Sequence, residues 1–395
     1  MEPLLIGWSA MSVISTYASW RYHSLMSQRG YPRNPIRSVV VVPIKGRSPT
    51  TEFFLKSLLA QDHPDYRLIF AVESLHDEAV ALIQAAQMMG ARDIEIIDAG
   101  LSEACGQKVW NLAAALKTLR DDDRFIVMAD ADVILPPGWL SNLNWAVVDQ
   151  GQEIVTGYRL ILAQSLSLPA MLVGSINLSV ATAPRITGLT AAWGGTMAMQ
   201  RSTLGRLDLE KHWDRALSDD LQLTAAAKEQ GILIHTNRST LLPTPWRGGF
   251  ADLFEFGIRQ FRILRLNDRL MHFGMLAALA VPIIGFVAAI QGMMAGGPLA
   301  AATLLLVGAS SILRGKIRRD IVGRAIEATP FIQDPARSYD GVTRPLWWPI
   351  FFLLALAGSL GRTVTWAGVT YLCSGPKVDA ITARRDMASA AGKPL

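Results

Sequence analysis

The segments SVVVVPIKG at residues 38–46 and RFIVMADAD at residues 124–132 decide the fold. Each contains an unbroken apolar run that stops at a Pro/Gly turn or at acidic residues, the pattern of a strand buried on both faces. Between them, RLIFAVE (67–73) and DIEIID (93–98) predict two further strands, and residues 51–60, 77–89 and 108–119 have helical spacing. This alternation predicts a doubly wound α/β domain over residues 37–270.

Apolar segments flank this domain. Residues 3–20 are uncharged and Arg21 and Arg29 follow them, which predicts a transmembrane helix over residues 1–24 and a cytoplasmic domain after it. A buried amphipathic helix is the alternative, because serines and a threonine dilute the run. Farther on, a Gly-Gly-Pro turn joins two apolar runs, which predicts a transmembrane hairpin over residues 271–313 and a basic cytoplasmic loop over 314–345.

The last apolar run, residues 346–360, is only 15 residues long. That length favours a re-entrant or interfacial helix within residues 346–372 over a full transmembrane crossing, which stays open as the alternative. The remaining residues, 373–395, are expected to form a flexible cytoplasmic tail.

The composition excludes several classes of protein. Half of the 395 residues are hydrophobic and 18% are charged, fewer charges than a soluble enzyme usually carries. The two cysteines form no CxxC motif, so the sequence offers neither a disulfide framework nor a cysteine-rich zinc site. The net charge of +5 is mild, and no concentrated basic patch indicates a nucleic-acid partner.

Two acidic motifs are candidates for chemistry. Asp130 and Asp132 follow a strand at positions i and i+2, so their carboxylates can converge on one Mg²⁺ or Mn²⁺ ion; a polar turn or helix cap is the alternative. Asp219 and Asp220 follow Ser218 at the start of a predicted helix. They suit either simple helix capping or a general base held at the helix N-terminus.

Arg259 and Arg262 lie three positions apart, on one face of a predicted helix just before the hairpin. Fixed guanidinium groups at that position suit a diphosphate or, equally, lipid headgroups.

Taken in order, these segments resemble the membrane-bound inverting glycosyltransferases of the GT-A fold, and most closely the ceramide glucosyltransferases and bacterial hopanoid-associated glycosyltransferases. The resemblance covers most of the chain. It rests on the opening strand–helix unit with QDHPDY (61–66), CGQKVWNLAAAL (105–116), DAD (130–132), WGGTMAM (193–199), the Asp219-Asp220 segment with Gly231, RQFRI (259–263) and GRTVTWAGVTY (361–371).

The resemblance implies a mixed GT-A sheet and roles for individual residues. It implies donor binding by Pro43, Glu73, Lys108, Asp130, Asp132, Arg259 and Arg262, acceptor binding by Trp193, Gly194 and Gly195, a Mg²⁺ or Mn²⁺ ion on Asp130 and Asp132, and catalysis by Asp220 with Asp219 beside it. Two departures from the family pattern are Glu73-Ser74, where the first acidic residue normally falls one position later, and Ile263 in place of the usual tryptophan.

The expected activity is transfer of a sugar, glucose or a similar hexose, from a UDP-sugar to the hydroxyl of a membrane lipid such as ceramide, a hopanoid or diacylglycerol. The reaction is expected at the cytoplasmic face of a bacterial inner membrane. Two alternatives are a polyprenyl-phosphate or processive polysaccharide glycosyltransferase and a non-catalytic membrane scaffold that retains the sugar-nucleotide fold.

Overall fold

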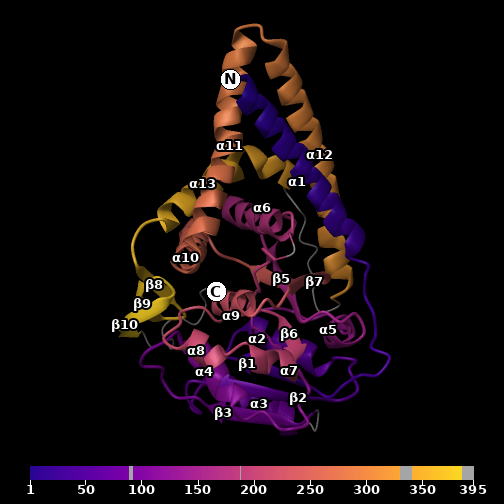
Figure 1. The fold of residues 1–395 in the computed structure, drawn as a ribbon, viewed down its shortest axis with the longest axis vertical. Coiled ribbons are helices and arrows are strands. Elements are labelled where there is room, and N and C mark those ends of the chain that lie inside the picture. Colours follow the sequence, from indigo (N-terminus) through magenta and orange to yellow (C-terminus); the bar gives the residue numbers. More distant parts are fainter. Residues whose placement is uncertain (89–91, 187, 330–339, 385–395) are drawn as a thin grey trace.

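The computed structural model describes the chain apart from residues 89–91, 187, 330–339 and 385–395 (Figure 1). Its centre is a seven-stranded sheet in the order β3-β2-β1-β4-β6-β5-β7. Strand β6 pairs antiparallel with both neighbours, and the other pairs are parallel. The mixed α/β fold expected from the sequence is therefore confirmed. The strands are β1 (Ser38–Pro43), β2 (Tyr66–Val72), β3 (Ile94–Asp98), β4 (Phe125–Met128), β5 (Ile154–Ala163), β6 (Met197–Gln200) and β7 (Ile234–Trp246).

Helices cover both faces of this sheet, because its buried strands place apolar side chains alternately on each face. In β1, Val40 and Val42 join one core cluster with Phe54 of α2, whereas Val39 and Val41 join another with Leu112 of α4. The helices on the first face are α2 (Pro49–Leu59), α3 (Glu78–Met88) and α5 (Trp139–Val148). Those on the second face include α4 (Gln107–Leu116), α8 (Leu209–Trp213) and α9 (Asp219–Glu229). The short helix α7 (Arg201–Arg206) follows β6.

The remaining helices form a wedge that projects from the sheet domain (Figure 1). They are α1 (Glu2–Leu25), α6 (Leu168–Ala181), α10 (Phe250–Asn267), α11 (Arg269–Met294), α12 (Pro298–Glu327) and α13 (Asp340–Gly358). Helices α11 and α12 form the expected hairpin, and α1 lies along it. Among the described residues, only α11 and α12 are long and apolar enough to cross a bilayer. Helix α1 covers the residues expected to be helical, and its place in a membrane stays a prediction.

The basic loop expected over residues 314–345 is a helix in its first part. Helix α12 continues to Glu327, and residues 330–339 lie outside the described part of the chain. Arg314 and Arg318 are buried on one face of α12, four positions apart, and donate to oxygen atoms of α1 and of the residue that ends α6. These partners accept hydrogen bonds from both guanidinium groups inside the protein, where the sequence had predicted a solvent-exposed loop.

The end of the chain also differs from its expectation, a helix within residues 346–372 followed by a flexible tail. Helix α13 ends at Gly358, and β8 (Thr363–Trp366), β9 (Val369–Ser374) and β10 (Lys377–Arg384) form a small antiparallel sheet. Ala367 and Gly368 have φ angles of 47° and 79°, which suit the tight turn between β8 and β9. The alternating burial of Val369, Tyr371 and Cys373 is a strand pattern that the overall apolar composition concealed.

Candidate active site

A polar cavity of about 190 Å³ lies at the carboxyl ends of β1, β2 and β4. This is where ligands usually bind in open α/β sheets. Side chains from α4, β5, α10 and the C-terminal sheet complete its wall. Among the lining residues are Pro43, Lys45, Glu73, Lys108, Asn111, Asp130, Asp132, Arg159, Arg259, Trp366 and Tyr371. We call it the polar cavity below.

Ion pairs hold the two carboxylates of the acidic motif. Lys108 Nζ lies 2.6 Å from Asp130 Oδ1, and Arg159 Nη2 lies 2.8 Å from Asp132 Oδ2. Burial favours loss of the charge on Lys108, but Asp130 and Asp219 outweigh it and hold the pKa of Lys108 above its usual range. Burial raises the pKa of Asp132, and neighbouring Asp130 adds to this effect against the opposing charge of Arg159.

The residues present fit a divalent cation beside a phosphate-bearing ligand. Asp132 Oδ1 is buried and accepts no hydrogen bond from any described residue. Two carboxylates can hold Mg²⁺ when substrate oxygens supply further ligands. No group of three or more His, Cys, Asp or Glu side chains suited to a metal occurs in the described part of the chain, so a ligand has to complete the coordination.

The N-terminus of α9 presents the second acidic motif. The Ser218 side chain caps this helix. Asp220 Oδ2 accepts the backbone N–H of Gly194 at 3.0 Å, and Oδ1 accepts the Ser218 hydroxyl at 2.5 Å and the Leu221 N–H at 2.8 Å. These three donors fix the orientation of the Asp220 carboxylate.

Asp219 is buried, and its carboxylate lies beside Lys108. Its Oδ2 atom lies 3.0 Å from Lys108 Nζ, although not in hydrogen-bond geometry. Burial raises the pKa of Asp219 to about 6 despite the lowering effect of Lys108, and the charges of Asp220 and Asp130 add to the rise.

An apolar cavity of about 330 Å³ adjoins the polar cavity. Asp220, Trp193 and Tyr158 line it, and most of its remaining wall comes from apolar side chains of α6, α10, α11 and α13, including Val173, Ile176, Leu253, Phe261, Met275, Phe351 and Leu354. The two cavities share the wall residues Lys108, Asp130, Arg159, Phe256, Gln260 and Trp366. The site therefore joins a charged compartment to an apolar one.

Comparison with known sequences identifies the family of the chain that has this pair of cavities. The profile described as Glycosyl transferase family 21 matches residues 6–377. The chain belongs to glycosyl transferase family 21. It is a glycosyltransferase, and the expectation of an enzyme is confirmed.

Two solved structures resemble this glycosyltransferase at low identity. One is the mannosyltransferase PcManGT from Pyrobaculum calidifontis in complex with GDP-Man and Mn²⁺, with 17% identity, 91% of this chain and 97% of that chain covered, and a TM-score of 0.47. The other is TarS residues 1–349 from S. aureus, with 11% identity, 89% and 100% covered, and a TM-score of 0.37. At these scores neither structure informs the substrates. No curated protein matches the chain in sequence.

The glycosyltransferase brings most of the sequence-predicted residues together. Pro43, Glu73, Lys108, Asp130, Asp132 and Arg259 line the polar cavity, whereas Trp193 and Asp220 line the apolar one. Gly194 donates to Asp220, and a β-carbon on Gly195 would overlap the Trp193 ring. Arg262 lines neither cavity and instead donates to Leu360 O at 2.9 Å and Thr363 O at 2.7 Å, which anchors the turn before β8.

Sequence reasoning missed several wall residues. Arg159 is a lone cation in the apolar strand β5, and that isolation is a signal that could have revealed it. Lys45 pairs with Glu73 at 2.8 Å and lies two residues after the end of the first strand. Trp366 lies in a cation–π contact with Lys108 at 6.0 Å, and the expectation of a helix there concealed its role.

Proposed function

We propose that this family 21 glycosyltransferase transfers a hexose from a UDP-sugar to the hydroxyl of a membrane lipid at the cytoplasmic face of a membrane. One observation carries the proposal: a charged cavity and an apolar cavity meet at a shared wall that includes Lys108 and Asp130. A charged compartment suits a nucleotide diphosphate, whereas an apolar one suits the body of a lipid.

The donor fits the polar cavity. Asp130 and Asp132 would hold Mg²⁺ or Mn²⁺, which when bound supplies positive charge that stabilises the departing diphosphate. Arg259 adds a cation from α10, and burial lowers its pKa to about 10. No carboxylate forms an ion pair with Arg259 within the described ranges, so the guanidinium is available to the diphosphate.

The acceptor fits the apolar cavity, where Asp220 is placed to act as general base. The acceptor oxygen attacks the anomeric carbon, the bond from that carbon to the diphosphate breaks, and the hydroxyl proton passes to Asp220. This single displacement inverts the anomeric configuration. Gly194, Ser218 and Leu221 keep the carboxylate oriented toward the cavity throughout.

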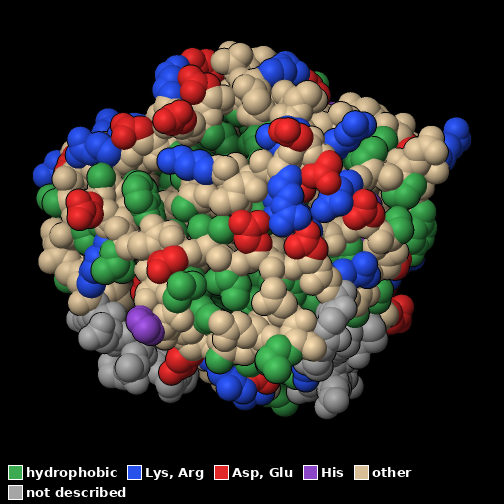
Figure 2. Space-filling model, turned by 90° about the horizontal axis from the view of Figure 1, so that it is seen from below, with side chains coloured by type: hydrophobic (Ala, Val, Ile, Leu, Met, Phe, Trp, Pro, Cys, Tyr) green, Lys and Arg blue, Asp and Glu red, His purple; other side chains and the backbone are tan. Residues whose placement is uncertain are grey.

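The membrane location rests on the surface of the hairpin. Helices α11 and α12 expose many large apolar side chains, including Ile284, Phe286, Val287, Met294, Leu305, Leu306, Ile312 and Leu313. On the face seen from the opposite end of the molecule, positive and negative side chains are interspersed (Figure 2). A bilayer around the hairpin would cover the exposed apolar area. It would also bring lipids to the apolar cavity, which α11 helps to line.

Transfer from a panel of radiolabelled UDP-sugars into lipid extract tests the proposal. The purified full chain is assayed with and without Mn²⁺, beside Asp220→Ala. We expect an organic-phase product that depends on Mn²⁺ and is absent with the variant. A product that stays in the aqueous phase, a polymer or a sugar linked to a polyprenyl phosphate would contradict the acceptor assignment.

A further inference from the structure

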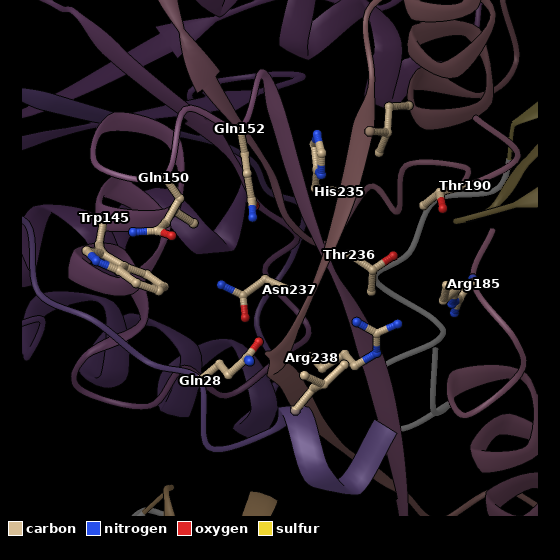
Figure 3. A pocket seen from close by; sticks show the side chains of 13 residues that line it. Gln28, Trp145, Gln150, Gln152, Arg185, Thr190, His235, Thr236, Asn237 and Arg238 are labelled. Atoms are coloured by element: carbon tan, nitrogen blue, oxygen red, sulfur yellow. The ribbon is translucent and has the colours of Figure 1, made fainter. Parts of the chain in front are cut away.

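A separate cavity of about 430 Å³ lies outside the active site, next to the end of α1 (Figure 3). Leu25 and Gln28 line it from the end of α1, and β7 forms another part of its wall. The other lining residues are Trp145, Ala146, Gln150, Gln152, Arg185, Thr190, Ile234, His235, Thr236, Asn237 and Arg238. The glycosyl transfer proposed above uses none of them, except that Arg185 also lines the apolar cavity.

Two arginines give this cavity positive charge that no acidic side chain among the described residues pairs with. Arg238 makes no ion pair or hydrogen bond with any described residue. Arg185 donates to Val180 O at 3.3 Å and keeps a buried Nε atom without a partner. Burial lowers the pKa of Arg238, and the nearby charges of Arg185 and Arg21 add to the effect. A half-buried cation without a counter-ion is costly, and an anionic ligand would offset that cost.

The other side of the cavity presents amides and an aromatic ring. In Figure 3 the side chains of Trp145, Gln150 and Gln152 lie on one side of the cavity, and Arg185 lies on the other. The amides of Gln150 and Gln152 form no hydrogen bond with the described residues. Free amides bind hydroxyl groups both as donors and as acceptors.

We propose that this cavity binds a phosphate ester that carries hydroxyl groups, the chemistry of a phosphoglycerol lipid headgroup. The phosphate lies at Arg185 and Arg238, since guanidinium groups bind phosphate in bidentate geometry, and the hydroxyls lie at the amides. The cavity lies at the end of α1, where the projecting helices join the sheet domain. If the hairpin lies in a bilayer, lipid headgroups can therefore reach the cavity. A soluble phosphate ester has the same chemistry.

Binding to the purified full chain in detergent tests the proposal without reference to transfer activity. Dihexanoyl phosphatidylglycerol, glycerol 3-phosphate and inorganic phosphate are titrated separately, with dihexanoyl phosphatidylcholine as the zwitterionic control. Arg238→Gln is expected to weaken binding about tenfold or more, as loss of a charged hydrogen-bond partner does. Arg206→Gln, which removes an exposed arginine paired with Glu153, is the charge-matched control and is expected to bind normally.

The variant is expected to keep its fold, because Arg238 has no partner to lose among the described residues; its melting temperature without ligand checks this. Tighter binding of phosphatidylglycerol than of glycerol 3-phosphate supports a lipid source, and equal binding supports a soluble ester. Equal binding by phosphatidylcholine, unchanged affinity in Arg238→Gln, or no binding by any of the three phosphates overturns the proposal.

Discussion

A β-carbon on Gly194 would lie 2.5 Å from Lys108 Nζ, well inside contact distance. The same β-carbon would lie 3.0 Å from Asp219 Oδ2 and 3.4 Å from Asp220 Oδ2. The absence of a side chain at residue 194 is therefore what allows the Lys108 ammonium to sit between Asp130 and Asp219.

Gly194→Ala is expected to lower kcat/KM at least tenfold while it changes the melting temperature little. The ammonium ends a flexible side chain, so Lys108 moves away from its carboxylates and the backbone stays in place. Gly205→Ala is the matched control: its β-carbon meets open space within α7, so activity should persist and stability should rise by about 0.5–1 kcal/mol. Full activity in Gly194→Ala would contradict this role.

Asp220→Asn is expected to lower kcat by about 10²–10⁴-fold, the usual contribution of a general base. The amide keeps the shape of the carboxylate but cannot take the acceptor proton. Affinity for the nucleotide donor, measured by titration with UDP, should stay close to that of the native enzyme. The exposed Asp121→Asn controls for the charge change. Lost donor binding in Asp220→Asn would show that Asp220 belongs to the donor site instead.

The raised pKa of Asp219 makes stability depend on pH. Its pKa is about 6 in the folded protein against 3.8 in the unfolded chain, so the folded state binds this proton more tightly. The contribution of Asp219 to stability is therefore lost as pH rises from about 4 to about 6. Asp219→Asn should therefore raise the melting temperature above that of the native enzyme. The increase should be larger at about pH 7.5 than at about pH 4.5. An equal difference at both pH values would contradict this assignment.

The strand–helix alternation was predictable from the sequence because buried parallel strands need unbroken apolar runs. The first four strands and three helices lie within a few residues of their expected places. The C-terminal sheet was not predictable in the same way. Only the four residues 359–362 separate the apolar helix α13 from its first strand. The partners of its strands, such as Gln107 against the Tyr371 hydroxyl, come from a distant segment.

The sequence predicted those site residues that belong to short local motifs. Asp130, Asp132 and Asp220 were found because strand ends and helix starts mark them. The Lys45–Glu73, Lys108–Asp219 and Arg159–Asp132 pairs join residues far apart in the chain, and only the folded structure brings them together.

Arg259 and Arg262 should behave differently, although one motif contains both. Arg259→Gln is expected to raise the KM for the donor without loss of melting temperature, because Arg259 lines the polar cavity and forms no ion pair within the described residues. Arg262→Gln removes hydrogen bonds to Leu360 O and Thr363 O and should lower the melting temperature. Donor kinetics and thermal unfolding of the two variants, measured side by side, distinguish the roles; a stable Arg262→Gln with weakened donor binding would reverse them.

The C-terminal sheet closes the wall of a cavity that begins at Pro43, near the other end of the chain. A ribosome must therefore synthesise the chain as far as Tyr371 before the polar cavity is complete. A nascent chain that ends before Trp366 already contains both acidic motifs but still lacks part of the cavity wall. Messages truncated before the codon for Trp366 should yield no partly active product, because the segment that closes the polar cavity has not been made.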